Sequence, residues 1–523
     1  MKSLSLCLAT VFAFADSSHA ELKLPAIFGD SMVLQQKQAD PIWGWDTAGT
    51  RVTVSFAGQV KTADADSAGR WTLKLDSMPA NAVPQTMTIK GTTERVMKDI
   101  LIGEVWMCSG QSNMRFNLKD DWKGDLEAMT ATIPGMRFIH VPEVGTQELQ
   151  SDFKGKWDVC TPESCKDFSA VGFFYGRYLH QILGVPVGLI NNAWSGSAAE
   201  AWVRRDSLQN DPRFHDTMDG WKKREEQITS ATGESDYQAA MEAWKKDAAA
   251  AQAEGKTAPR APDSPQALLT GHSRPGNIFN GVVNPTIGYG MKGVIWYQGE
   301  SNSTRAWEYA RLFPFMIERW RAEWKQGDFP FYWVQLADYR DEKPEPGEAM
   351  WAELREAQTK TLSLPNTGEA VITDLGEAND IHPKNKLDVA ARLVRWALAK
   401  DYGMKIACRS PEFKSASVAG NKIAVTLDCY GGVLRTKDVA EVRGFAICGA
   451  DKVWQWAQAK ITGDDTLEVW SEKVPVPLVV RYAWSDNPVC NLLTKDGLPV
   501  TPFRSDDFEL TTRPKPPEVK AAP

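Results

Sequence analysis

The sequence predicts an α/β protein whose central part is a parallel β-sheet wrapped by helices, with a β-sandwich domain on either side. Between residues 99 and 401, short apolar runs rich in β-branched residues alternate with longer amphipathic runs, as in repeated βαβ units. Before and after this part, short alternating runs are separated by Gly, Asp, Asn and Pro, a pattern typical of β-sandwiches. The chain therefore divides into a β part, an α/β part and a second β part.

A length of 523 residues agrees with several domains. The predicted division is a signal peptide (1–20), an N-terminal β-sandwich domain (21–98), an α/β domain (99–401), a C-terminal β-domain (405–511) and a Pro- and Lys-rich disordered tail (512–523). Within the α/β domain, the stretch 237–266 is rich in Ala, Lys, Glu and Pro. This composition predicts an inserted, exposed helix followed by a flexible linker.

The elements expected in the α/β domain follow from the period of the apolar residues. The expected strands are 100–107, 136–141, 185–190, 293–296, 329–336 and 370–373. The expected helices are 172–183, 306–324, 351–362 and 386–399.

The first twenty residues resemble an export signal. Lys2 supplies a positive charge, residues 4–15 are mostly apolar, and Ser18-His19-Ala20 resembles a cleavage site with small residues. The apolar run is too short to cross a bilayer, so no membrane span is expected. We predict cleavage after Ala20 and export to the periplasm or the medium.

The charge and the cysteines narrow the classes of function. A net charge of −7, from 60 basic and 67 acidic residues, argues against a nucleic-acid partner. An exported chain can form disulfides, and Cys160 and Cys165 could close a short loop. The four C-terminal cysteines could form two bridges, which leaves Cys108 unpaired. The sequence contains no CxxC or HExxH spacing, so neither a zinc site nor another metal site is expected.

The stretch 100–114, ILIGEVWMCSGQSNM, is the strongest candidate for a catalytic element. A buried strand ends there in a run of small and polar residues, and a helix pattern follows. Such a turn can present a nucleophile, while the start of the helix directs free N–H groups at developing negative charge. Ser112 is the predicted nucleophile. The alternative is that Ser112 only caps the following helix, since the stretch lacks the G-x-S-x-G spacing of the α/β-hydrolase elbow.

Polar residues follow four of the predicted strands, and the carboxyl ends of parallel strands meet at one edge of a sheet. The four segments are GQSN at 110–113, NNAWSGS at 191–197, YQGESN at 297–302 and DIHP at 380–383. A serine hydrolase needs a base, an orienting acid and oxyanion donors. His382 is the predicted base, since it follows Asp380 and precedes Pro383 before a helix. His140 and His180 lie in regular elements and are expected to be structural, and His215 and His272 lie in loops without a partner signal.

These motifs, GQSNM at 110–114, NNAWSGS at 191–197, WYQGESN at 296–302 and DIHPKN at 380–385, resemble those of the sialate O-acetylesterase family of the SGNH-hydrolase superfamily. The resemblance covers residues 99–401. It implies a flavodoxin-like sheet, no cofactor, and hydrolysis of O-acetyl esters on sugars. The implied partner is an acetylated sugar or oligosaccharide.

Carried over by position, the resemblance implies that Ser112 is the nucleophile and His382 the base. The N–H groups of Ser112 and Gly196 and the side chain of Gln298 would form the oxyanion hole. The superfamily's usual acid lies three residues before the histidine, where this chain has an asparagine. The orienting acid is therefore Asp380 or Glu300, or the enzyme works as a Ser–His dyad.

Asn113, Trp194 and Arg274 lie in or near these motifs and are candidate substrate-binding residues. Asn302 begins a glycosylation sequon, NST, which we interpret as a coincidence beside the site. Three functions remain open. The first is a sialate O-acetylesterase, the second is an esterase that acts on acetylated xylan or xyloglucan, and the third is an inactive sugar-binding protein. The intact set of catalytic residues favours an enzyme.

Overall fold

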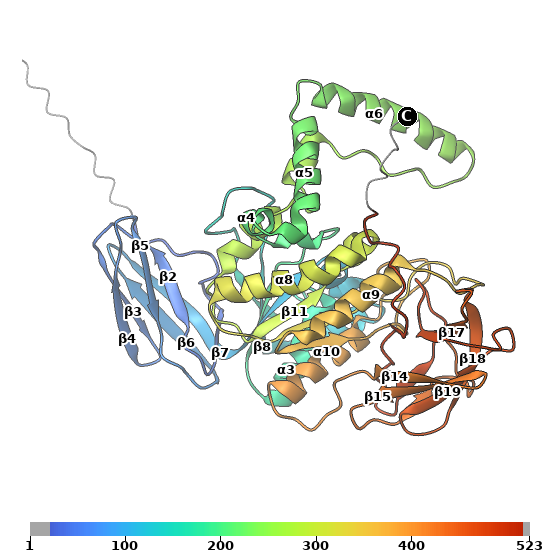
Figure 1. Ribbon diagram of the computed structural model, residues 1–523. Coiled ribbons are helices and arrows are strands. Elements are labelled where there is room, and N and C mark those ends of the chain that lie inside the picture. Colours follow the sequence, from blue (N-terminus) through green and yellow to red (C-terminus); the bar gives the residue numbers. More distant parts are fainter. Residues whose placement is uncertain (1–20, 516–523) are drawn as a thin grey trace, which may run out of the picture.

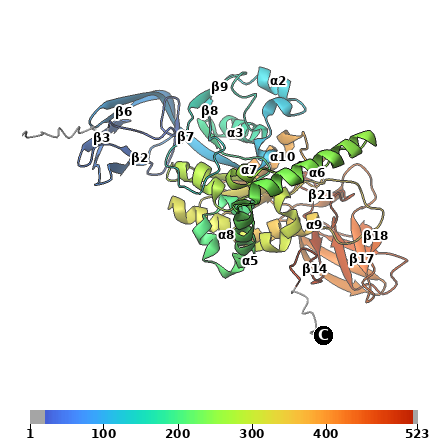
Figure 2. The ribbon, with the colours of Figure 1, turned by 90° about the horizontal axis from the view of Figure 1, so that it is seen from above.

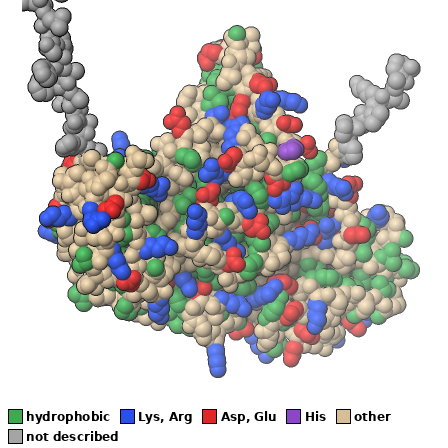
Figure 3. All heavy atoms as spheres, turned by 60° about the vertical axis from the view of Figure 1, so that its left-hand side comes forward, with side chains coloured by type: hydrophobic (Ala, Val, Ile, Leu, Met, Phe, Trp, Pro, Cys, Tyr) green, Lys and Arg blue, Asp and Glu red, His purple; other side chains and the backbone are tan. Residues whose placement is uncertain are grey.

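The computed structural model describes residues 21–515. Figure 1 shows an α/β centre between N-terminal strands on one side and C-terminal strands on the other. The predicted signal peptide lies outside the described residues. None of the described helices is long and apolar enough to cross a membrane. Lys and Arg side chains are interspersed with Asp and Glu on the face that Figure 3 shows.

The central sheet continues from the β-strands of the N-terminal part and is mixed. Its strands in the α/β part lie in the order β13-β12-β11-β7-β10-β8-β9, and all neighbours are parallel except β8 and β9. The bounds are β13 (Thr367–Ala370), β12 (Phe331–Val334), β11 (Gly293–Tyr297), β7 (Glu94–Gly110), β10 (Val187–Asn191), β8 (Ile133–His140) and β9 (Trp157–Cys160). The predicted α/β centre is confirmed. The last strand lies earlier than expected, since residues 371–373 follow it as coil.

Alternate residues of the strands face two separate cores, as the period of a strand requires. Val105, Val294 and Phe331 pack with helices α8 (Ala306–Trp324) and α9 (Met350–Lys360). Trp106 and Ile295 pack on the other face with helices α3 (Ala170–Leu183) and α10 (Lys386–Lys400). Figure 2 shows these helix pairs on opposite sides of the sheet. Because the neighbouring strands from β13 to β8 are parallel, their carboxyl ends meet at one edge of the sheet.

Strand β7 is longer than the predicted strand 100–107 and passes through the expected boundary at residue 98. Its first half pairs with β1 and β6 of the N-terminal part, and its second half pairs with β10 and β11. The pattern changes along it, because every residue from Ile100 onward is buried while most before it are exposed. The other N-terminal strands are β1 (Val33–Gln35), β2 (Pro41–Trp45), β3 (Arg51–Phe56), β4 (Gln59–Asp64), β5 (Arg70–Lys74) and β6 (Asn81–Lys90).

The C-terminal part differs from the predicted β-sandwich. It forms one antiparallel sheet in the order β14-β15-β19-β18-β17-β20-β22, with a separate pair β16-β21. The sheet curls toward a barrel, because Phe413 of the first strand stacks on Phe503 of the last at 4.7 Å between ring centroids. The bounds are β14 (Glu412–Ala419), β15 (Lys422–Asp428), β16 (Leu434–Thr436), β17 (Phe445–Cys448), β18 (Gln455–Ile461), β19 (Thr466–Trp470), β20 (Val479–Tyr482), β21 (Leu492–Thr494) and β22 (Phe503–Arg504).

A helical arm projects from the α/β centre between β10 and β11 (Figure 1). It contains α4 (Arg205–Gln209), α5 (His215–Ile228), α6 (Gly233–Ala253) and α7 (Pro265–Thr270). The predicted exposed helix corresponds to α6, which begins earlier than expected and has only Gly233 buried. Residues 256–264 form the coil that follows it. The arm is therefore larger than the insertion predicted from composition.

Two short helices, α1 (Ser112–Arg115) and α2 (Gly124–Met129), follow β7.

All cysteines of the described residues carry free thiols, so the expected disulfides are not formed. Cys160 donates to the Ala131 carbonyl at 3.5 Å and Cys165 to the Pro162 carbonyl at 3.6 Å. Burial raises the pKa of the Cys160 thiol to about 12, which disfavours the thiolate that disulfide exchange needs.

Thr512, where a disordered tail was expected to begin, is held by hydrogen bonds in the structure. Both the backbone N–H and the hydroxyl of Thr512 donate to the Glu353 carboxylate, which is almost fully buried in α9. Residues from 516 onward lie outside the described part.

Candidate active site

Ser112 lies on the turn after the central strand β7. Gly110, the last residue of this strand, has φ +130°, and a Cβ there would lie 2.2 Å from the Tyr297 carbonyl oxygen of β11. Only glycine allows this close approach. The Gln111 N–H then donates to that same carbonyl at 2.9 Å, and the Trp194 N–H donates to the Gly110 carbonyl at 2.9 Å. The turn is thereby fixed between the loops that follow β10 and β11.

The structure does not support the alternative role of Ser112 as a helix cap. Ser112 is the first residue of α1, and the cap position is occupied by Gln111. The helix is only one turn long, shorter than the pattern suggested. Within residues 21–515, the Ser112 hydroxyl makes no hydrogen bond, either to His382 or to another residue, and it is half-buried. A free hydroxyl on a fixed turn is available to attack a substrate.

Asn113 connects the Ser112 turn to the loop of His382. Its side-chain amide donates to Glu300 Oε1 at 2.7 Å and to the Ile381 carbonyl at 3.0 Å, while its Oδ1 accepts from Lys386 Nζ at 2.6 Å. The side chain is buried. Both amide hydrogens are therefore used within the protein, and the predicted role of Asn113 in binding substrate is not supported. Asn113 instead holds three parts of the site together.

A buried lysine lies behind Asn113, which sequence reasoning missed. Lys386 is fully buried at the start of α10, where burial lowers its pKa to about 7 and the nearby Glu300 carboxylate opposes that shift. Its ammonium also lies over the rings of Phe116 and Tyr297, at 4.7 and 5.3 Å. Burial raises the pKa of Glu300, and the Asn113 hydrogen bond and Lys386 oppose it. Oε2 of Glu300 is buried without a hydrogen-bond partner.

His382 lies beside Asp380 rather than Glu300. Asp380 Oδ1 accepts the backbone N–H of His382 at 2.9 Å and lies 3.6 Å from its Nδ1. Burial and the nearby Lys386 lower the pKa of His382, and Asp380 opposes them. The imidazole is 37% exposed, so it borders the solvent-facing side of the site. A neutral imidazole with a carboxylate near one nitrogen can act as a base through the other.

Gly196 lies in the loop after β10 with φ +73°, a conformation that favours glycine. Its carbonyl accepts from the Ser301 hydroxyl at 2.9 Å. A Cβ at this position would lie 3.1 Å from the His272 ring, so the imidazole packs directly on the glycine. Sequence reasoning found no partner for His272, because nothing in the sequence connects its loop, far along the chain, to Gly196.

Gln298 is fully buried and bound on every side. Its amide donates to the Ser197 carbonyl at 3.0 Å and to Asn302 Oδ1 at 2.7 Å, and its Oε1 accepts from Tyr309. Since both amide hydrogens are occupied, Gln298 does not fit the predicted role of oxyanion donor. Asn302 is also buried and donates to Glu200, so its amide is inaccessible for glycosylation in the folded protein. This agrees with the interpretation of the sequon as a coincidence.

Comparisons with known proteins identify the family. Residues 279–393 match the family model described as carbohydrate esterase, sialic acid-specific acetylesterase. The sialate O-acetylesterase of Mus musculus is 28% identical over 90% of this chain and 92% of its own length, and that of Homo sapiens is 28% identical over 96% and 95%. The crystal structure of a carbohydrate acetylesterase from Xanthomonas citri covers 93% of this chain and all of its own chain, with 34% identity and a TM-score of 0.78.

The chain belongs to the sialate O-acetylesterase family. It is a carboxylic ester hydrolase that acts on O-acetyl groups of carbohydrates. The family model includes the WYQGESN and DIHPKN motifs, so the resemblance read from the sequence is confirmed for this family.

Of the other two predicted substrate-binding residues, Arg274 is paired within the protein and Trp194 is partly exposed. Arg274 donates to the Glu225 carboxylate at 2.7 Å and to the Leu269 carbonyl at 3.0 Å, and Arg205 binds the same carboxylate. Since its charge is already paired, Arg274 stabilises the arm rather than binding substrate. Trp194 is half-buried beside Gly145, and its ring packs on the core. It retains an exposed portion at the edge of the site.

Within the described part of this esterase, no group of three or more His, Cys, Asp or Glu side chains could hold a metal ion.

Proposed function

We propose that this esterase uses Ser112 as its nucleophile, His382 as the base and Asp380 as the orienting acid. The observation that carries the proposal is the Asn113 amide, which donates to the Ile381 carbonyl at 3.0 Å. The residue after the nucleophile is thereby bonded to the residue before the base. This contact supports a site in which the Ser112 hydroxyl and the imidazole approach each other across substrate.

In the proposed reaction, His382 Nε2 takes the proton of the Ser112 hydroxyl as its oxygen attacks the acetyl carbonyl. The tetrahedral intermediate collapses, the C–O bond to the sugar breaks, and the imidazolium returns the proton to the sugar oxygen. Water, deprotonated by the same imidazole, then attacks the acetyl-enzyme. Acetate leaves and Ser112 regains its proton.

The proposed oxyanion donors are the backbone N–H groups of Ser112 and Gly196. Donors of this kind stabilise the negative charge that develops on the carbonyl oxygen. Gln298 would not contact the oxyanion. It would position the Gly196 donor, since it binds the Ser197 carbonyl next to Gly196 and thereby fixes that loop.

Asp380 is proposed to hold His382 with Nδ1 protonated, so that Nε2 is free to accept a proton. The 3.6 Å separation from Nδ1 supports this, because hydrogen bonds in apo sites are often long and tighten when substrate binds. The lowered pKa of His382 keeps the imidazole neutral, as a base requires, down to a lower pH than usual.

The finer fold assignment is a flavodoxin-like sheet of the SGNH-hydrolase superfamily. If β8 and β9 are set aside as an edge extension, the order β10-β7-β11-β12-β13 is 2-1-3-4-5 in chain order. In such sheets ligands bind where the order reverses, at the ends of the first strand and its neighbours. Ser112 and Gly196 follow those strands, which supports the assignment.

The proposed substrate is an O-acetylated sialic acid, the sugar named in the family description and in the names of the relatives. The experiment is acetate release from O-acetylated sialosides, O-acetylated xylan and p-nitrophenyl acetate, with wild type and Ser112→Ala. We expect wild type to release acetate fastest from the sialosides, and Ser112→Ala to release none above background. Faster release from xylan would replace the proposed sugar. Undiminished release by folded Ser112→Ala would overturn the proposed nucleophile.

A further inference from the structure

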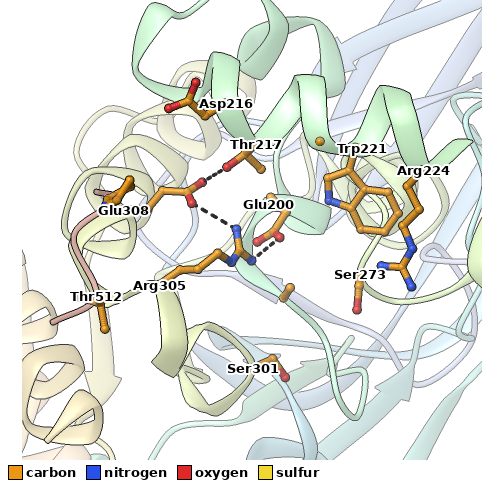
Figure 4. Close-up of a pocket in the computed structure, with 13 residues that line it drawn as sticks. Glu200, Asp216, Thr217, Trp221, Arg224, Ser273, Ser301, Arg305, Glu308 and Thr512 are labelled. Carbon is orange, nitrogen blue, oxygen red and sulfur yellow. Dashed lines mark hydrogen bonds and ion pairs between the residues drawn. The ribbon is translucent and has the colours of Figure 1, made fainter. Parts of the chain in front are cut away.

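A hollow of about 510 Å³ opens beside the Gly196 loop. Ser301, which binds the Gly196 carbonyl, and Ser273, which follows His272, both line it. The other walls come from helix α5 of the arm, from the start of α8 and from Thr512 (Figure 4). Neither Ser112 nor His382 lines the hollow. A group bound in it therefore lies next to the reacting ester and is not the ester itself.

The groups on one side of the hollow are already bound to one another. Arg305 pairs with the carboxylates of Glu200 and Glu308, and the Thr217 hydroxyl donates to Glu308 at 2.5 Å. Figure 4 shows this chain of contacts across one side of the hollow. These contacts form a fixed wall with little capacity to bind a ligand of its own.

The opposite side carries groups that are free. Trp221 and Arg224 both project from α5 toward the hollow (Figure 4). The Arg224 guanidinium lies 5.1 Å from the Trp221 ring centroid, and within residues 21–515 it has no carboxylate partner. The indole is half-buried, so part of it faces the space. The hollow thus offers an aromatic surface and five N–H donors. The Ser273 hydroxyl on the same side is hydrogen-bonded to His272 Nδ1 at 3.0 Å.

This combination fits a sugar ring. The apolar C–H face of a pyranose packs on the electron-rich face of an indole, and its hydroxyls accept from the guanidinium group. The volume lies within the range of about 300 to 1,000 Å³ typical of small-molecule sites. A purely apolar ligand would leave the charged wall unsolvated, which is costly.

We infer that the hollow is a second sugar subsite, which binds the unit next to the acetylated one. The preferred substrate is then an acetylated glycoside or oligosaccharide rather than a free acetylated monosaccharide. The inference rests on the proposed placement of the reacting ester at Ser112. It also gives the helical arm a function, because α5 supplies the aromatic side of the subsite.

The test compares kcat/KM for two substrates, free 9-O-acetyl-N-acetylneuraminic acid and 9-O-acetylated sialyllactose. We expect wild type to prefer the glycoside, and Trp221→Ala to lower the ratio of glycoside to monosaccharide by about tenfold or more, since even one lost methylene contact in a pocket costs about tenfold. Trp221→Phe should restore most of the ratio, because it restores an aromatic face.

The matched control is Trp244→Ala, in α6 of the same arm, whose indole donates to the Pro259 carbonyl away from the hollow. It should leave the ratio unchanged. An unchanged ratio in Trp221→Ala, or a wild type that prefers the monosaccharide, would overturn the subsite. Because a general loss of folding lowers both values and leaves the ratio intact, the refuting result is an unchanged ratio in a Trp221→Ala protein that keeps the wild-type kcat/KM for the monosaccharide. Failure of the proposed nucleophile is seen separately, as Ser112-independent hydrolysis of p-nitrophenyl acetate.

Discussion

The two carboxylates near His382 lie in opposite surroundings. Asp380 is 43% exposed and binds the histidine of its own loop through one oxygen. Glu300 is bound by Asn113 through Oε1, while its Oε2 is buried without a partner, and burial raises its pKa. The comparison indicates two different tasks. In the proposed mechanism, the carboxylate near the solvent orients the base, and the buried one, near Lys386, holds the turn of the nucleophile.

The different tasks of the two carboxylates follow from the free-energy cost of burying a charge. A buried carboxylate and a buried ammonium compensate each other only if hydrogen bonds fix their geometry. Asn113 provides that connection, since it binds Glu300 and Lys386 with opposite ends of its amide. The loss of this support should change the position of the site, whereas the loss of Asp380 should change its chemistry.

The largest expected effect is that of removing the reacting groups, which both carboxylates serve. Ser112→Ala and His382→Ala should each lower kcat by about a millionfold, as for other serine hydrolases, because nucleophile and base act as a unit. The measurement is acetate release under saturating substrate. Circular dichroism and thermal unfolding of each variant check the fold. A residual rate within tenfold of wild type in either variant would refute its role.

Loss of the Asn113 contacts should lower kcat less than loss of the nucleophile or the base. Asn113→Ala breaks the bond to Ile381 and leaves Glu300 and Lys386 unconnected, so the two catalytic loops should shift relative to each other. A misplacement of about 1 Å can cost about a hundredfold in rate, and we expect a loss of that size in kcat. Asn379→Ala is the control, since Asn379 is exposed in the same loop as Asp380. Wild-type kcat in Asn113→Ala would show that the connection is dispensable.

Lys386, the buried lysine, should influence the pKa of the proposed base, His382. Lys386 lowers the pKa of His382, and Lys386→Met removes that charge, so the pKa of His382 should rise. Since the neutral imidazole is the active form, the acid limb of kcat/KM should move to higher pH. Lys384→Met, an exposed position in the same loop, is the control. A limb that moves to lower pH in Lys386→Met contradicts this account of the electrostatics.

The smallest effect is expected from metal removal. In the proposed mechanism, backbone N–H groups polarise the carbonyl, so turnover should be unchanged after dialysis against EDTA. Loss of activity that returns with added zinc or calcium would require a different mechanism. Rates before and after dialysis provide the measurement.

Much of the fold could be predicted because burial leaves a local pattern. The apolar run after residue 99 indicated the central strand, and the period of residues 386–399 indicated α10 within one residue of its end. The continuity of β7 across residue 98, where a domain boundary was predicted, could not be foreseen, since the strand pairs with different partners along its length. The closing of the C-terminal sheet likewise depends on contacts between distant residues such as Phe413 and Phe503.

The placement of Ser112, Gly196 and His382 in segments that follow strands could be predicted, because a motif carries each of them, while their catalytic roles are part of the proposal. The roles of Asn113 and Gln298 could not, because a sequence does not show which amide hydrogens are already bound. Lys386 did leave a signal, since it shares the helix face of Val389 and Leu393, both fully buried. A lysine at such a position is expected to be buried or paired.

The comparison of the two carboxylates is tested most directly by kcat for Asp380→Asn and Glu300→Gln, measured side by side on folded protein. Asparagine keeps the hydrogen bond to the His382 N–H but cannot hold the catalytic tautomer, and the expected loss is about 10⁴-fold. Glutamine keeps the acceptor for Asn113, so Glu300→Gln should lose tenfold or less. A larger loss in Glu300→Gln than in Asp380→Asn would reverse the assignment. Near-normal turnover in both would reduce the site to a Ser112–His382 dyad.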